Sequence, residues 1–181
     1  MKATITEELE IPQGVTITLE PGMIHVQGPK GKTQRKVILP GITIKQENNN
    51  LVFTVVNGTL NEKRMINTTL AHVKAMIRGV QEGYVYELKI CSGHFPMTVS
   101  IDGKNVIIKN FLGEKVPRRA QILEGVTVKA EGDKVICEGI NKEDVSQTAA
   151  RIELATKIKG RDRRIFQDGV YIVTKAGEAL T

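Results

Sequence analysis

Short stretches in which apolar and polar residues alternate recur along the chain, a pattern typical of β-strands with one buried face. Val15–Leu19 and Met23–Val26 alternate in this way on either side of Pro21-Gly22, which predicts a hairpin. Further strands are expected at the remaining short apolar runs, which are Val37–Leu39, Ile42–Lys45, Leu51–Val55, Tyr84–Ile90 and Val170–Val173.

Two stretches have helical spacing instead. In the first, from about Glu62 to Arg78, apolar residues recur at every third or fourth position, and Gly79 is expected to end the helix. The second begins after Asn141, where Asn141 or Asp144 can cap the first turn. Its apolar stripe, which we expect to lie on a sheet, comprises Val145, Ala149, Ile152, Ala155 and Thr156.

The second half of the sequence repeats the first. A shift of 82 positions aligns Val15–Glu20 with Met97–Asp102, and a shift of 84 aligns Leu39–Glu47 with Leu123–Glu131, where five of nine positions are identical. Both copies then enter a helix after an asparagine, Asn61 or Asn141, and finish in a short strand. The sequence therefore predicts an α+β protein built from two tandem copies of a small unit, in which one helix packs on one face of an antiparallel sheet. We place the first domain at residues 1–82 and the second at residues 83–181.

Composition excludes several classes of protein. With 181 residues, of which 40% are hydrophobic, the chain is long and apolar enough to form packed cores. Its apolar runs are shorter than the roughly 18 residues of a membrane span, so we expect a cytoplasmic protein with no membrane partner. Cys91 and Cys137 lack partners at short spacing, and we interpret them as reduced, buried thiols. The histidines lie far apart in the sequence, so no metal site or cofactor is expected.

Positive charge concentrates just after the second helix. Five cations and one carboxylate give +4 over Lys157–Arg164, compared with +6 for the whole chain. Cations at this density repel one another unless an anion binds among them, which favours a polyanion as partner. The candidate contacts are Lys157, Lys159, Arg161, Arg163 and Arg164, with Lys115, Arg118, Arg119 and His94 from other loops of the second half. A smaller patch on the first half comprises Lys30, Lys32, Arg35 and Lys36.

Other interpretations of these residues are weaker. Gly31-Lys32-Thr33 suggests a phosphate-binding loop, but Val26 stands where that motif needs a glycine and a strand follows instead of a helix. Gly28–Gly31 has the form of an RNA-clamping loop, but it joins strands instead of helices. Few aromatic residues and many cations favour the backbone of folded RNA over single-stranded bases. An enzyme acting on RNA, through Lys32 or His94, and a basic protein-interaction module are the alternatives.

Several motifs together resemble one known family, the large-subunit ribosomal protein numbered six in the universal scheme. The resemblance covers essentially the whole chain and is of the archaeal and eukaryotic form. The bacterial tyrosine-containing signature and the long basic extension of eukaryotic members are absent, which favours the archaeal type. The resemblance depends on the duplicated unit and on Gly93–Pro96, Asn110–Lys115, Val145–Gln147, Ala149-Ala150, Ile152, Lys159–Arg164 and Asp168–Tyr171.

This resemblance implies a structural protein without catalysis. Two related α+β domains are implied, the second of which binds large-subunit ribosomal RNA, and not DNA, near the translation-factor-binding region and the stalk base. Neighbouring ribosomal proteins are the other implied partners, with one copy of the chain in each ribosome.

Overall fold

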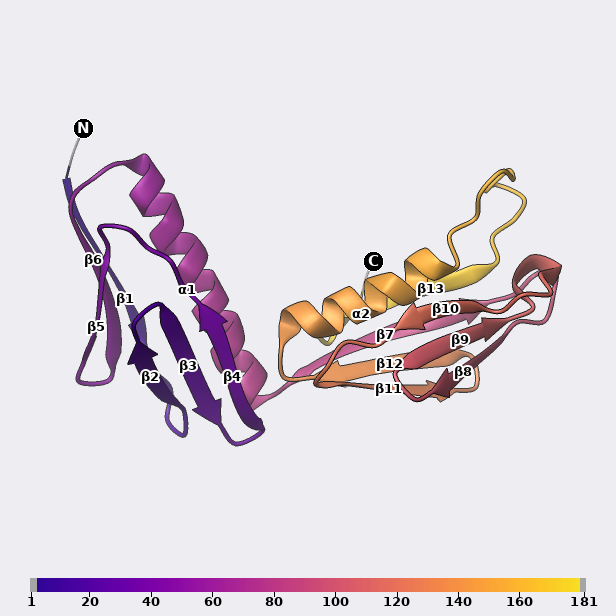
Figure 1. Cartoon of the computed structure of the whole chain (residues 1–181), viewed down its shortest axis with the longest axis horizontal. Helices are drawn as coiled ribbons and strands as arrows, with labels where there is room; N and C mark the ends of the chain where they lie inside the picture. The colour runs from indigo at the N-terminus through magenta and orange to yellow at the C-terminus, as the bar shows by residue number, and fades with distance from the viewer. Residues whose placement is uncertain (1–2, 180–181) are drawn as a thin grey trace. The chain divides into compact units, whose positions relative to one another are not determined.

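A computed structural model describes residues 3–179 and divides into two compact units, one ending at Glu82 and the other beginning at Gly83 (Figure 1). Each unit combines antiparallel strands with one long α-helix, as expected for tandem α+β copies.

The first unit holds two three-stranded sheets and one helix. The strand orders are β1-β6-β5 and β2-β3-β4, and helix α1 packs against both sheets. The bounds of these elements are β1 Ala3–Glu10, β2 Thr16–Glu20, β3 Met23–Gly28, β4 Gly31–Lys36, β5 Thr43–Glu47, β6 Asn50–Gly58 and α1 Leu60–Gln81.

The second unit has the same plan with a larger sheet. Its strand orders are β10-β9-β8 and β11-β12-β7-β13-β14, and helix α2 packs on β10, β7, β13 and β12. The bounds are β7 Tyr84–Cys91, β8 Thr98–Asp102, β9 Asn105–Lys109, the 3₁₀ turn η1 Phe111–Gly113, β10 Arg118–Gln121, β11 Val126–Glu131, β12 Lys134–Gly139, α2 Lys142–Ala155, β13 Gly169–Lys175 and β14 Glu178–Ala179.

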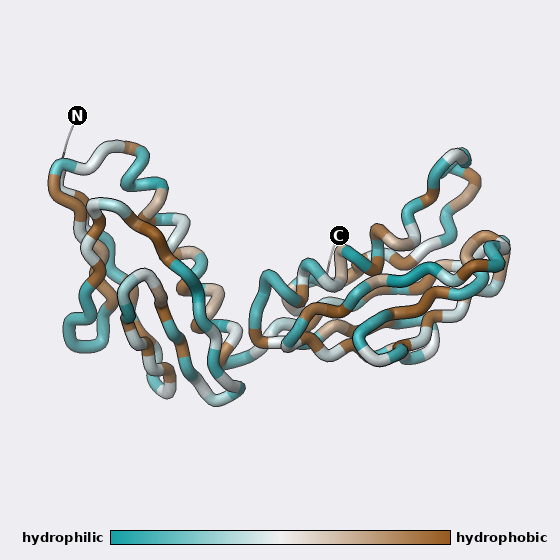
Figure 2. Tube along the Cα trace, viewed as in Figure 1, coloured by the Kyte–Doolittle hydropathy of each residue, from teal (hydrophilic) through white to brown (hydrophobic). Residues whose placement is uncertain are grey.

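The repeat in the sequence corresponds to a repeat in the fold. A shift of 82 positions takes the bounds of β2 onto those of β8, and a shift of 84 takes the start of β6 onto the start of β12. Between these elements the copies diverge, because the turn of Gly28–Gly31 is replaced by the longer η1 loop between β9 and β10. Hydrophobic and hydrophilic stretches alternate along the strands of both units in Figure 2.

The core of the second unit lies between α2 and its sheets. Val145, Thr148, Ala149 and Ile152 are the buried residues of α2, and Thr156 is buried at its C-cap. The predicted stripe is therefore confirmed at four positions, and Ala155 is half-buried. Asn141 caps this helix, because its side chain accepts a hydrogen bond from the Glu143 N–H at 3.0 Å.

The buried Cys137 is shielded from water, which raises the pKa of its thiol to about 12. Cys91 is only half buried, so burial of both thiols was a wrong expectation.

Two strand predictions for the first half are wrong, and one strand is unpredicted. The acidic segment at the start forms the unpredicted strand β1, and the strand expected at Val37–Leu39 is instead β4, which consists of the preceding basic residues. An edge strand with a solvated face needs no apolar alternation, so the hydropathy pattern gave no signal there. The strand beginning at Tyr84 does not close the first unit, because β7 pairs with β12 and β13 of the second.

Helix α1 is longer at both ends than its apolar spacing suggests. Gly79 lies buried inside the helix, and the chain turns at Gly83, where φ is +77°. Glycine inside a helix costs about 1 kcal/mol, which the neighbouring Val80, fully buried against Gly28, can offset. At the other end Thr59, not Asn61, is the cap: its side chain accepts from the Asn61 N–H at 3.3 Å, while the Glu62 carboxylate accepts from the Thr59 N–H at 2.7 Å.

The capping pair gives a direct test of this helix start. Replacing Thr59 with alanine removes an acceptor for the first turn, and we expect it to lower the free energy of unfolding by about 1 kcal/mol. The control, Asn61→Ala, is expected to change that free energy by less than about 0.5 kcal/mol. Urea unfolding followed by circular dichroism measures both, and a larger loss for the Asn61 variant would contradict the assignment.

Candidate nucleic-acid interface

Three loops of the second unit are joined into one surface. They follow β7 (residues 92–97), β9 (residues 110–117) and α2 (residues 156–168), and side chains from each contact another. The loop after α2 projects beyond the helix (Figure 1), and it is mainly hydrophilic with a short hydrophobic stretch on each stem (Figure 2). This loop carries the dense basic stretch.

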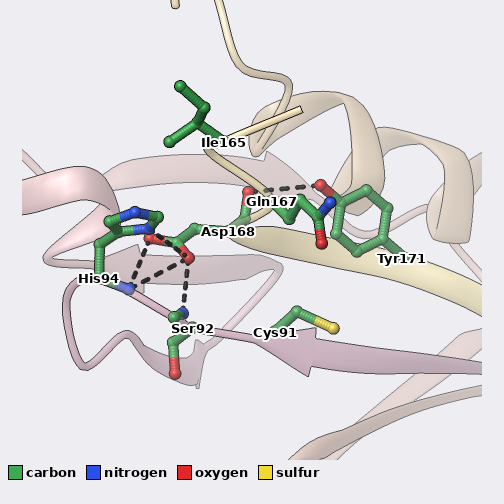
Figure 3. Close-up of a pocket in the computed structure, with 8 residues that line it drawn as sticks. Cys91, Ser92, His94, Ile165, Gln167, Asp168 and Tyr171 are labelled. Carbon is green, nitrogen blue, oxygen red and sulfur yellow. Dashed lines mark hydrogen bonds and ion pairs between the residues drawn. The ribbon is translucent and has the colours of Figure 1, made fainter. Parts of the chain in front are cut away.

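Asp168 ties the loop after α2 to the loop after β7. Its carboxylate, only 4% exposed, accepts hydrogen bonds from the Gly93 N–H at 2.6 Å and the His94 N–H at 3.3 Å, and faces His94 Nδ1 at 3.4 Å (Figure 3). Burial alone would raise the pKa of Asp168, but the donors at Gly93 and His94 outweigh it and lower the pKa. Glycine suits this close approach, because an added Cβ would lie 3.2 Å from the carboxylate oxygen, a tight contact.

An aromatic ring of the basic loop lies against His94. The Phe166 and His94 rings stack with centroids 4.8 Å apart, and the Arg161 guanidinium carbon lies 4.9 Å from the centre of the Phe166 ring. Arg161 is therefore held at the surface by a cation–π contact. Since Asp168 faces Nδ1, His94 has Nε2 as its other ring nitrogen for binding a ligand.

The loop after β9 is joined to the loop after β7. The Asn110 side chain donates to the Pro96 carbonyl at 2.9 Å, and the exposed Phe95 ring lies 3.5 Å from where a Cβ on Gly113 would stand. The η1 turn itself is tight, with left-handed backbone at Asn110, Leu112 and Gly113. Such backbone is costly for leucine and persists where surrounding contacts require it.

Arg118 connects the loop after β9 to the end of α2. Its guanidinium donates to Glu114 at 2.6 and 2.8 Å and to the Ala155 carbonyl at 2.8 Å, and it lies 4.2 Å from the centre of the buried Phe111 ring. The hydrogen bond from Arg118 lowers the pKa of Glu114, and the charge of Arg161 adds to this effect. Arg118, a predicted contact, therefore has its donors directed at the protein, where it satisfies carbonyls at the helix end.

The other predicted cations of the second unit lie either on strand β10 or on the three joined loops. Arg119 leaves β10 on the side opposite to Arg118 and Ala120, because side chains alternate along a strand. Arg164 donates to the Asp162 carboxylate at 2.7 Å, yet its side chain is 90% exposed. The cations that lie exposed on the three joined loops are Lys115, Lys157, Lys159, Arg161, Arg163 and Arg164.

The smaller patch on the first unit is split between two faces. Lys32 and Lys36 are exposed on one face of β4, whereas Arg35 lies on the other and contacts His72 of α1 at 3.1 Å. Lys30, in the β3–β4 turn, donates to the Glu82 carbonyl. Gly31-Lys32-Thr33 form part of β4, so they do not make a phosphate-binding loop.

Asp168 and Phe166 organise this surface, although the charge pattern gives neither of them a role in the site. A buried carboxylate beside arginines in the sequence resembles an ordinary surface acid until the fold brings Gly93 next to it. The only available signal is the Asp168–Tyr171 motif. Within residues 3–179 no group of three potential metal ligands forms, and none of the helices there is long and apolar enough to cross a membrane.

Comparison with known proteins gives one consistent family. The family described as Ribosomal protein L6 matches residues 11–83 and 95–169, one segment for each repeat. The chain is 50% identical over 178 residues to large ribosomal subunit protein uL6 of Methanococcus vannielii, covering 98% of each protein. It is 46% identical over 173 residues to the protein of that name from Methanobrevibacter smithii, covering 96% of this chain and 97% of the other.

The role of Asp168 can be tested by Asp168→Asn. We expect this variant to lose about 1–3 kcal/mol of unfolding free energy at pH 7. Because the folded pKa of Asp168 is lowered, its stabilisation is complete above the ordinary aspartate pKa of about 4 and is lost as the pH falls through the lower folded value. The difference from wild type should therefore shrink in acid.

Urea unfolding between pH 7 and pH 3 measures this difference, with Asp102→Asn, an exposed carboxylate at the end of β8, as control. A difference that is independent of pH would contradict the role of the Asp168 charge.

Proposed function

Since the chain belongs to the ribosomal protein L6 family and is thus a structural, non-enzymatic protein of the large ribosomal subunit in the cytoplasm, we propose that its second unit grips folded ribosomal RNA. The observation that carries this proposal is the set of three joined loops: the buried Asp168 ties the basic loop to the loop after β7, and the exposed Arg161 lies over the Phe166 ring.

The loops suit a phosphate backbone better than single-stranded bases. Two of their three phenylalanine rings are engaged within the protein: Phe111 is buried, and Phe166 stacks on His94 and contacts Arg161. Phe95 is exposed, which leaves one ring on which a base could stack. Single-strand readers need exposed rings on which bases stack, whereas backbone recognition needs cations at fixed positions. Partial fixing of Arg161 and Arg164 before binding lowers the ordering cost of that contact.

The candidate contacts divide by what their side chains touch. We propose Lys115, Lys157, Lys159, Arg161, Arg163 and Arg164 as phosphate contacts, with His94 beside them. Arg118 is a positioning residue, which holds the loop after β9 against the end of α2. Arg119, Lys30, Lys32 and Lys36 are secondary contacts, and Arg35 is directed at α1.

The salt dependence of binding tests the phosphate grip. Neutralisation of about six phosphates gives a slope near five in a plot of log affinity against log salt concentration. We expect Lys159→Ala with Arg163→Ala to weaken binding to a large-subunit ribosomal RNA transcript and to lower this slope by about two. The matched pair Lys32→Ala with Lys36→Ala, also exposed, should do less.

Filter binding at several salt concentrations gives these slopes, and circular dichroism checks that the variants fold. Equal losses for the two pairs would mean that both units share the surface, and a wild-type slope near one would contradict the grip.

We further propose that the RNA bound lies near the translation-factor-binding region and the stalk base, beside neighbouring ribosomal proteins and with one copy of the chain per subunit. A hydroxyl-radical probe attached to Lys159→Cys, in a Cys91→Ser background, should cut ribosomal RNA in that region of assembled subunits. The same probe at Glu131→Cys, at the end of β11, is the control for proximity of the loops. Cuts confined to other regions would overturn the location while leaving the grip itself intact.

A further inference from the structure

Strand β1 of the first unit has an open edge. Within the described residues it pairs with β6 alone, in an antiparallel ladder from Ala3 to Glu10. An unpaired edge of this length presents a row of backbone N–H and C=O groups to which another strand can add. Natural proteins usually cover or shorten such edges, so an open edge of eight residues suggests that another strand covers it.

The second unit fills the corresponding position. A shift of 84 takes Leu51 onto Val135, and these residues pair with Leu9 of β1 and Leu88 of β7 respectively, so β1 corresponds to β7. Leu88 is paired on its other side with Ile172 of β13, which α2 also contacts. The first unit has no such strand in its described part, because the chain after α1 passes into β7.

A hollow lies beside the end of β1. It has a volume of about 390 Å³ and is lined by Leu9 and Glu10 of β1, Pro12, and Lys74, Ile77 and Arg78 of α1, together with Gln81. In the second unit the strand next to β7 packs under its helix at the corresponding place. The hollow and the open edge together therefore provide apolar lining and backbone groups for one added strand.

Charge restricts what can add there. β1 carries Glu7, Glu8 and Glu10 and no cation, in a chain of net charge +6. Glu7 lies on the inner face with the buried Leu9, whereas Glu8 and Glu10 are exposed on the outer face. These carboxylates repel phosphates, and a second copy of β1 would bring like charges together.

We propose that β1 is the docking edge for an extended segment of another protein, in which apolar residues alternate with lysine or arginine. The segment adds to the sheet as a strand beside β1 and takes the place that β13 holds in the second unit. Its apolar side chains lie on the inner face beside Leu9, and its cations face Glu8 and Glu10 on the outer face. This surface belongs to the first unit and does not depend on the RNA contacts of the second.

Nuclear magnetic resonance of the full-length chain tests this proposal. The probe is a ten-residue peptide that alternates valine and lysine, and we expect it to shift the amide signals of β1 and of the last turns of α1. A peptide that alternates valine and glutamate should bind about tenfold more weakly, and a valine–lysine peptide with a central proline should not bind, because proline cannot complete the ladder.

Variants locate the charge contact. Glu8→Lys should weaken binding of the valine–lysine peptide about tenfold, with Glu10→Lys as a second variant if Glu8→Lys does not fold. Glu131→Lys, a matched change at the end of β11, should leave binding unchanged.

Three results would overturn the proposal: equal binding of the lysine and glutamate peptides, signal changes confined to other edges such as β5 or β11, or dimerisation of the chain alone in sedimentation.

Discussion

The buried carboxylate of Asp168 is the contact on which the basic surface depends. Lysines and arginines crowded on one loop repel one another, so without an internal anchor the loop would spread its charges in solvent. Asp168 fixes the base of that loop by accepting the Gly93 and His94 N–H groups, and a Cβ on Gly93 would crowd the carboxylate oxygen at 3.2 Å. His94 then supports Phe166, which in turn supports Arg161. A single buried charge is thus linked through two rings to an exposed cation, Arg161.

Positive residues in this protein serve two different purposes. Arg118 has its guanidinium among Glu114, the Phe111 ring and carbonyls at the end of α2, where it replaces the hydrogen bonds that a helix end lacks. Lys159 and Arg163, by contrast, are exposed on the loop. Arginine suits the first role because its planar group donates in several directions at once. A count of cations therefore overestimates the number available to RNA, and only contacts within the fold separate the two kinds.

Duplication has produced two units with one plan and different surfaces. In the second unit the loop between β9 and β10 is longer, the loop after α2 is basic, and β13 completes the sheet. In the first unit the β3–β4 connection is a tight turn and the corresponding sheet ends at β1. Family membership places both units in the large ribosomal subunit. The differences between the copies are consistent with RNA contacts on one unit and a protein contact on the other.

The sequence by itself determined the α+β class, the duplication, the amphipathic stripe of α2 and the concentration of charge at Lys157–Arg164. These features depend on local periodicity, internal similarity and composition, which are present in the order of residues. It carried no signal for β1 and misplaced β4, because their edge positions need no apolar alternation. It was also misleading for Gly79, whose cost within α1 is offset by packing at Val80.

Only the tertiary structure decided which residues from distant parts of the chain meet. Asp168 lies 74 positions from His94, and Arg118 lies 37 positions from Ala155, so neither contact has a local signal. The assignment of β7 to the second unit is of the same kind, because a strand's partners are chosen by the packing of whole sheets. Local pattern specifies the elements, whereas burial and long-range hydrogen bonding specify which elements pack together. The joined loops of the second unit depend on contacts of this second kind.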